Sequence, residues 1–203
     1  MKILKIAVTG GPCGGKTASL AHIRALAEGE GYRVLVLAET ATELIGGGVS
    51  PMTCASRAEY QSYQLALQTL KEEIFLSAAR GMMAEKILIV CDRGLPDNCA
   101  YMTEEECTAV LSARGECMAE YYARYDAAFH LATAALGAEA CYTTENNTAR
   151  TETVAEAREV DMHLRAAWAG HPRRYIIENT GNFADKMQEL SRLLLPLLRE
   201  VSE

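Results

Sequence analysis

An apolar run from Ile3 to Thr9 leads directly into a glycine-rich segment, and an amphipathic pattern follows. The segment is Gly10-Gly11-Pro12-Cys13-Gly14-Gly15-Lys16-Thr17, which fits the pattern G-x-x-x-x-G-K-T. Glycines let the backbone turn its N–H groups toward a phosphate, the lysine reaches the β- and γ-phosphates, and the threonine hydroxyl binds Mg²⁺. The chain is therefore predicted to bind a nucleoside triphosphate with Mg²⁺ through residues 10–17 and the adjacent Ala18. A glycine-rich turn without a ligand is the alternative.

Five β-rich runs alternate with segments whose apolar residues recur at helical spacing. The runs are Ile3–Thr9, Arg33–Ala38, Lys86–Cys91, Asp126–Ala132 and Arg174–Glu178. Helices are expected over Gly15–Glu28, Ser56–Ala79, Glu104–Ser112, Gly115–Arg124, Thr153–Trp168 and Phe183–Glu203. Alternating strands and helices predict an α/β fold in which helices cover both faces of a parallel sheet.

Composition narrows the classes of partner. The 203 residues suit one domain, and the net charge of −7 without a basic run disfavours nucleic acid. No apolar run is long enough for a membrane span or a signal peptide, so we expect a cytoplasmic protein, monomeric or homodimeric. The odd number of seven scattered cysteines favours reduced thiols over a disulfide framework.

Polar residues follow three of the predicted strands, where ligands bind in sheets of this class. Asp92 ends a buried run in the manner of a Walker B carboxylate and is predicted to hold Mg²⁺, with Arg93 beside it binding an anionic group. Glu39 follows the second strand and is a candidate to accept a proton from an attacking hydroxyl. A helix cap or surface acid accounts for Glu39 as well, and Glu43 is the substitute if that segment is helical.

A polar connection from Thr143 to Glu152 precedes a charged helix and is interpreted as part of a lid at about residues 143–158. Arg150 and Arg158 are candidates to meet charge on the transferred phosphoryl group, although surface ion pairs explain them nearly as well. Asn179, after the last strand, is a candidate contact to the nucleotide base, with a plain helix-start turn as the alternative.

Several of these features together resemble one family: the glycine-rich loop, Glu39, Asp92-Arg93-Gly94-Leu95-Pro96-Asp97 with Tyr101, and Arg150-Thr151-Glu152 followed by Ala157 and Arg158. They are similar to the small AAA-type P-loop domains related to the nicotinamide riboside kinase domain of bacterial NAD regulators, and more distantly to thymidylate and deoxynucleoside kinases. The resemblance implies a three-layer P-loop NTPase fold with a five-stranded parallel sheet in the order 2-3-1-4-5.

The same resemblance implies a kinase that transfers the γ-phosphate of Mg·ATP to a hydroxyl of a small, nucleoside-like metabolite. Lys16, Glu39, Asp92, Arg93 and the lid arginines are the expected catalytic residues. A nucleotide-dependent switch with slow hydrolysis and no acceptor is the alternative. The N-K-x-D guanine motif is absent from the sequence, which favours ATP over GTP.

Overall fold

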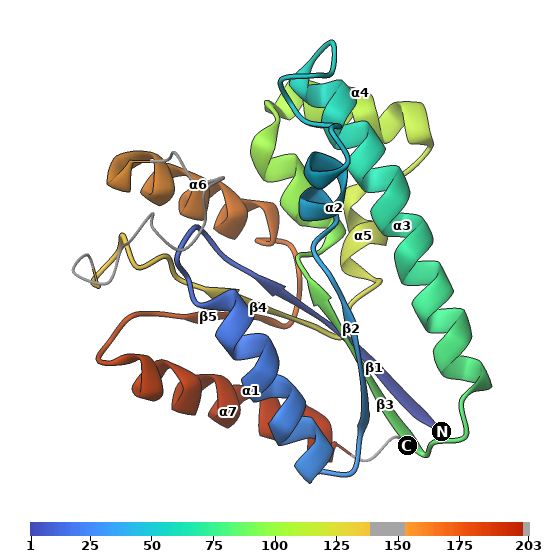
Figure 1. Ribbon diagram of the computed structural model, residues 1–203, viewed down its shortest axis with the longest axis vertical. Coiled ribbons are helices and arrows are strands. Elements are labelled where there is room, and N and C mark those ends of the chain that lie inside the picture. Colours follow the sequence, from blue (N-terminus) through green and yellow to red (C-terminus); the bar gives the residue numbers. More distant parts are fainter. Residues whose placement is uncertain (139–152, 201–203) are drawn as a thin grey trace.

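In the computed structural model, which describes residues 1–138 and 153–200, five strands form one parallel sheet in the order β2-β3-β1-β4-β5 (Figure 1). The strands are β1 (Lys2–Thr9), β2 (Arg33–Leu37), β3 (Lys86–Asp92), β4 (Ala127–Leu131) and β5 (Arg174–Ile177). Every predicted strand is confirmed to within one residue at either end, and so is the order implied by the family resemblance.

Helices connect the strands and pack on both faces of the sheet. They are α1 (Lys16–Gly29), α2 (Thr40–Gly46), α3 (Arg57–Gly81), α4 (Glu104–Arg114), α5 (Met118–Tyr122), α6 (Val154–Ala167), α7 (Phe183–Arg199) and the 3₁₀ helix η1 (Leu95–Tyr101). The predicted helix over Gly115–Arg124 is reduced to the short α5. No helix in the described ranges is long and apolar enough to cross a membrane.

The core has two layers, one on each face of the sheet. On one face, α1 and α7 bury Ile23 and Leu190 against Phe129 and other residues of the central strands. On the other face, the C-terminal half of α3 and Trp168, which follows α6, pack against Ala128 and its neighbours. Because both faces are covered, the central strands are apolar almost throughout, as parallel strands in this class are.

Strand register brings the ends of the strands to the same edge. Asp92 pairs with Val8 of β1, so the end of β3 lies directly beside the start of the glycine-rich loop. On the other side of β1, Thr9 pairs with His130 of β4. The polar residues that follow these strands therefore gather around the loop at the carboxyl edge of the sheet.

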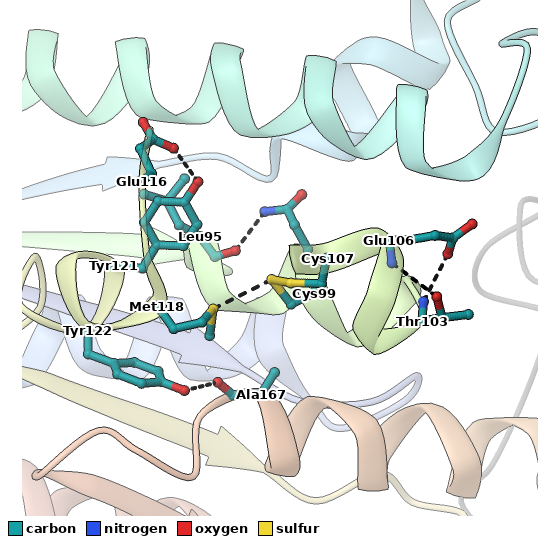
Figure 2. Close-up of a disulfide and its surroundings, with 11 residues drawn as sticks. Leu95, Cys99, Thr103, Glu106, Cys107, Glu116, Met118, Tyr121, Tyr122 and Ala167 are labelled. Atoms are coloured by element: carbon teal, nitrogen blue, oxygen red, sulfur yellow. Dashed lines mark hydrogen bonds between the residues drawn. A yellow bond between two sulfur atoms is a disulfide. The ribbon is translucent and has the colours of Figure 1, made fainter. Parts of the chain in front are cut away.

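A disulfide links Cys99 of η1 to Cys107 of α4, with Sγ of Cys99 also near the Met118 sulfur at 3.6 Å (Figure 2). The expectation that the cysteines are reduced thiols is wrong for this pair. Their spacing of eight residues gave no recognised pattern, but the turn between η1 and α4 brings the two Cα atoms to 5.5 Å, within the range that a disulfide spans.

Candidate functional site at the carboxyl edge of the sheet

The glycines of the loop between β1 and α1 are required by close packing. Gly10 has a φ of 141°, and a Cβ there would collide with the carbonyl oxygen of Leu131 in β4. Gly15 has a φ of 86°, and its Cβ would lie 2.6 Å from the Phe183 ring. Since L side chains rarely adopt these dihedrals, the loop needs glycine to turn its backbone as a phosphate cradle requires.

Lys16 and Thr17 open α1 at the end of this loop. The Nζ of Lys16 donates to the carbonyl oxygens of Gly10 and Gly11 at 3.1 and 3.5 Å, so the ammonium lies over the loop. Burial and then the nearby Arg93 lower the pKa of Lys16 to about 8. Thr17 and Ala18 are exposed on the first turn, where a phosphate-bound cation and the nucleotide would contact them.

Glu39 and Arg93 come from two neighbouring strands and form an ion pair. The Nε of Arg93 donates to Oε1 of Glu39 at 2.6 Å, and the Thr42 hydroxyl donates to Oε2 at 2.7 Å. Burial works against ionisation of Glu39, but the charge of Arg93 and these two bonds lower its pKa to about 2. Glu39 is therefore an ionised acceptor, and Arg93 is held in place beside it.

Arg93 is fixed by its backbone as well. Its φ of 71° is in the left-handed region, which costs a non-glycine residue roughly 1 kcal/mol or more. Its N–H donates to the carbonyl of Val8 at 2.9 Å, and its Nη1 lies 3.7 Å from Oδ1 of Asp97. Burial disfavours the charge, but Tyr101, Glu39 and Asp97 outweigh it and raise the pKa of Arg93.

Asp92 fits a cation-binding role. It is half-buried, and its Oδ1 has no hydrogen-bond partner within the described ranges. Burial first raises the pKa of Asp92, and the neighbouring Glu39 raises it further against the effect of Lys16. A carboxylate oxygen that burial leaves without a donor is suited to Mg²⁺, which takes one or two carboxylates and completes its shell with phosphate and water. No group of three or more His, Cys, Asp or Glu side chains in the described part of the chain could hold a metal alone.

Asp97, from η1, joins the strand edge to the helices behind it. It accepts from the hydroxyl of Thr9, from the Gly94 N–H at 2.7 Å and from the Trp168 indole N–H at 3.2 Å. Only 1% of Asp97 is exposed. This carboxylate fixes the position of the segment that carries Arg93.

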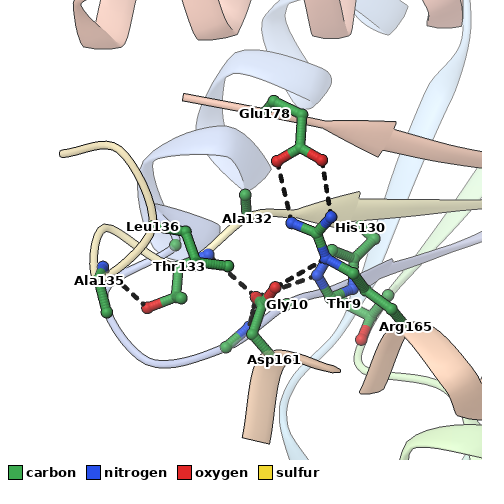
Figure 3. Close-up of polar contacts among 12 residues, drawn as sticks. Thr9, Gly10, His130, Ala132, Thr133, Ala135, Leu136, Asp161, Arg165 and Glu178 are labelled. Atoms are coloured by element: carbon green, nitrogen blue, oxygen red, sulfur yellow. Dashed lines mark hydrogen bonds and ion pairs between the residues drawn. The ribbon is translucent and has the colours of Figure 1, made fainter. Parts of the chain in front are cut away.

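Asp161 of α6 binds both the glycine-rich loop and the segment that follows β4 (Figure 3). Its Oδ1 accepts from the N–H groups of Gly11 and Thr133 at 3.1 and 2.9 Å and from Nε2 of His130 at 3.0 Å. Its Oδ2 accepts from Nε of Arg165 at 2.8 Å. Burial of Asp161 opposes ionisation, but these donors lower its pKa to about 2.

Lys186 of α7 completes the support of the loop. Its Nζ donates to the carbonyl oxygens of Gly14 at 3.0 Å and Ala132 at 2.7 Å and to Oδ1 of Asn179 at 2.9 Å. Burial lowers the pKa of Lys186 to about 8. The amide of Asn179 also donates to the Thr133 and Leu136 carbonyls, both at 2.7 Å, so its side chain joins the segments that follow β4 and β5.

A family model described as an AAA domain (AAA_28) matches residues 5–186, which cover both the glycine-rich loop and the strand ends described above. The chain belongs to this AAA domain family. No curated protein matches it significantly. Membership in this family and the five-stranded parallel sheet support a P-loop nucleotide-binding domain.

The AAA domain brings together four of the predicted site residues. At the carboxyl edge of the sheet, the charges of four residues shift one another's pKa values: Lys16, Glu39, Asp92 and Arg93. Arg150 lies outside the described residues. Arg158, in the first turns of α6, donates from Nε to the Ala135 carbonyl at 2.6 Å.

Glu43, the substitute for Glu39 considered from the sequence, lies at the surface. The segment after Glu39 is helical, and Glu43 forms an ion pair with Lys71 at 2.7 Å on the surface. Sequence reasoning gave no role to Asp97, which it named only within the run that carries the family resemblance, and it did not single out Asp161 or Lys186. For Asp97, the run Gly94-Leu95-Pro96-Asp97 contained a usable signal, because a carboxylate three residues after a turn commonly accepts from the backbone there.

Proposed function

We propose that this AAA domain is a kinase that transfers the γ-phosphate of Mg·ATP to a hydroxyl of a small, nucleoside-like metabolite. The observation that supports this best is the ion pair between Glu39 and Arg93. Both residues lie close enough to Lys16 for their charges to shift its pKa, and so does Asp92. A phosphate-binding lysine then lies next to an ionised carboxylate that the loop itself does not use.

Phosphoryl transfer needs positive charge at the phosphates and a negatively charged hydrogen-bond acceptor at the attacking hydroxyl. Lys16, which donates to its own loop in this structure, would turn its ammonium to the phosphates, and Arg93 adds a second positive charge beside them. Thr17 and Asp92 are the residues that would hold Mg²⁺, which neutralises charge on the phosphates when bound. Glu39 would accept a hydrogen bond from the acceptor hydroxyl.

The low pKa of Glu39 defines its role. A carboxylate with a pKa of about 2 is a weak base, so it orients the hydroxyl and takes the proton late, after the bond to phosphorus has begun to form. Phosphoryl transfer tolerates this because its transition state is loose and depends mainly on positioning and charge.

The test is ADP production from Mg·ATP with and without a panel of nucleosides and other hydroxyl metabolites, with Lys16→Ala as the blank. Turnover that requires one acceptor is expected, and Glu39→Gln should lower its kcat about 10²–10⁴-fold. Glu43→Gln is the matched control on α2, the short helix that begins directly after Glu39, because the Glu43 carboxylate pairs with Lys71 at the surface.

Two results would contradict the proposal. Slow turnover that is indifferent to the whole panel would instead support a nucleotide-dependent switch that hydrolyses ATP without an acceptor. Acceptor phosphorylation that survives Glu39→Gln would leave the kinase but remove Glu39 from it.

A further inference from the structure

The solvent-exposed face of α3 carries a row of four large apolar side chains: Tyr63, Leu67, Leu70 and Ile74. Tyr63 is 46% exposed, Leu70 is 54% exposed and Ile74 is 55% exposed, and Leu67 is half-buried. The helix has 25 residues and runs along the outside of the molecule (Figure 1). Scattered apolar residues are normal on a surface, but a contiguous row of them is typical of an interaction site.

The spacing of this apolar row is that of a helix that pairs with another helix. Its members follow one another at four, three and four residues, which are the a and d positions of a heptad repeat. At about 100° per residue they lie within about 60° of one another around the helix axis. This is the narrow seam of a helix pair, and α3 already packs on its own domain through the opposite face, where Leu65 and Ala79 are buried.

Two opposite charges flank the ends of the apolar row. Glu59 lies on the first turn of α3 and Arg80 on the last, and both occupy the g position of the heptad, on the same side of the row. The Ala55 N–H and the Tyr63 hydroxyl donate to the Glu59 carboxylate at 2.7 and 2.9 Å, so this carboxylate is held in place.

These charges distinguish between the two orientations of a helix pair. In an antiparallel pair of identical helices the g positions face each other, so Glu59 of each copy would lie opposite Arg80 of the other. In a parallel pair each g position faces the e position five residues on, which places Glu59 against Gln64 and brings no opposite charges together within α3. The charge pattern therefore favours the antiparallel orientation.

Two exposed methionines follow the same symmetry. Met52 precedes α3 and is 94% exposed, and Met83 follows α3 and is 101% exposed. These are the highest exposures among the large apolar side chains in the described ranges. Because the two residues lie almost equally far along the chain from the midpoint between Leu67 and Leu70, an antiparallel pair brings Met83 of one copy toward Met52 of the other.

We propose that this domain forms a two-fold symmetric dimer in which α3 packs antiparallel against α3 of a second copy. Leu67 and Leu70 lie beside the two-fold axis, and Tyr63 of each copy packs against Ile74 of the other. A two-fold interface uses the same surface on both copies, so it requires the self-complementary pattern that this face of α3 has. The dimer is independent of the proposed kinase reaction.

The size of the surface sets the strength of the dimer. From Tyr63 to Ile74 the apolar row is about 17 Å long at 1.5 Å per residue. An interface of this length is at the small end of specific interfaces, where association is weak and reversible. We therefore expect a dissociation constant on the order of 10 μM.

The experiment is sedimentation velocity of the full chain from about 1 to about 200 μM, over which the wild type should change from monomer to dimer. Leu70→Glu places two carboxylates beside the two-fold axis and should raise the dissociation constant about 100-fold or more. Met162→Glu is the matched control, because it makes the same kind of change at an apolar side chain that is 58% exposed on α6. It should leave the dissociation constant unchanged.

Exchange of the flanking charges tests the orientation. Arg80→Glu should weaken the dimer about three- to tenfold, because it places a carboxylate opposite Glu59 in both halves of the interface. Arg57→Glu is the control: it makes the same change of charge at an exposed position on the other side of the apolar row, and it should have no effect. The double variant Glu59→Arg with Arg80→Glu should restore the wild-type dissociation constant to within about twofold.

Melting temperatures separate loss of the dimer from loss of the fold. At about 1 μM, where every variant is monomeric, each should melt within a few degrees of the wild type, because the substituted side chains lie at the surface of the monomer. A chain that stays monomeric up to about 200 μM, or a dimer that Leu70→Glu leaves intact, would overturn the proposal. A dimer that the double variant fails to restore would overturn the antiparallel orientation.

Discussion

Replacing Asp161 by asparagine keeps the shape of the side chain and removes the charge that holds the phosphate-binding loop. The pKa of this carboxyl is lowered from 3.8 to about 2 in the folded protein. At 1.36 kcal/mol for each pKa unit, the fold stabilises the carboxylate by about 2 kcal/mol. Asparagine also places an amide N–H against one of the four donors that Asp161 accepts, so the expected loss of unfolding free energy at pH 7 is about 2–4 kcal/mol.

The pH dependence of the unfolding free energy tests whether the charge of Asp161 causes this stabilisation. Because the pKa of Asp161 is lower in the folded than in the unfolded chain, its stabilisation is complete above about pH 5 and is lost as pH falls toward 2. Wild type and Asp161→Asn should therefore differ most at pH 7, and the part of that gap due to charge should be about half as large at pH 3.

Urea denaturation at both pH values measures this difference. Asp185→Asn is the control, because that carboxylate only caps α7 at an exposed position, with one bond of 3.0 Å to the Asn182 N–H. A gap below about 1 kcal/mol at pH 7, or a gap unchanged at pH 3, would refute the view that an ionised Asp161 supports the loop.

Other predictions concern the loop and the disulfide. Since the pKa of Lys16 is about 8, Mg·ATP affinity should fall as pH rises from 7 to 9.5, approaching tenfold for each unit above 8; a fluorescent nucleotide titration that stays flat would contradict this. Gly10→Ala should abolish nucleotide binding and lower the melting temperature, whereas Gly29→Ala, where an added Cβ meets nothing within 4 Å, should do neither. Replacing Cys99 and Cys107 by serine should lower the unfolding free energy by about 2–3 kcal/mol, from the entropy of the loop they close; equal urea midpoints for the two proteins would argue against it.

Sequence patterns predicted the sheet because its signals are local and strong. The strands are short apolar runs bounded by polar turns. The helix starts are local too, because Thr103 with Glu106 and Thr153 with Glu156 fit the T-x-x-E capping box, and the structure has both boxes. Two elements were missed, α2 and η1. Both are seven residues long, which is too short for helical periodicity to show, and Leu95-Pro96 more often indicates a turn.

The candidate site was predictable only in part. Asp92 ends β3, Arg93 and Glu39 come within two residues of a strand end, and Lys16 closes the loop after β1, so position along the chain was enough to place them at one edge. Asp161 and Lys186 were not predictable in this way. They lie within helices, and their bonds to Gly11 and Gly14 span 150 and 172 residues, a separation over which one sequence carries no spacing signal.

The supports of the phosphate-binding loop also determine when it can form during synthesis. The loop itself belongs to the first residues made, yet the carboxylate that fixes Gly11 and the ammonium that fixes Gly14 come from α6 and α7. A nascent chain therefore carries an unsupported loop until residue 186 has left the ribosome. We therefore expect nucleotide to contribute little to the early, co-translational folding of this domain, and its affinity to rise once α7 has docked.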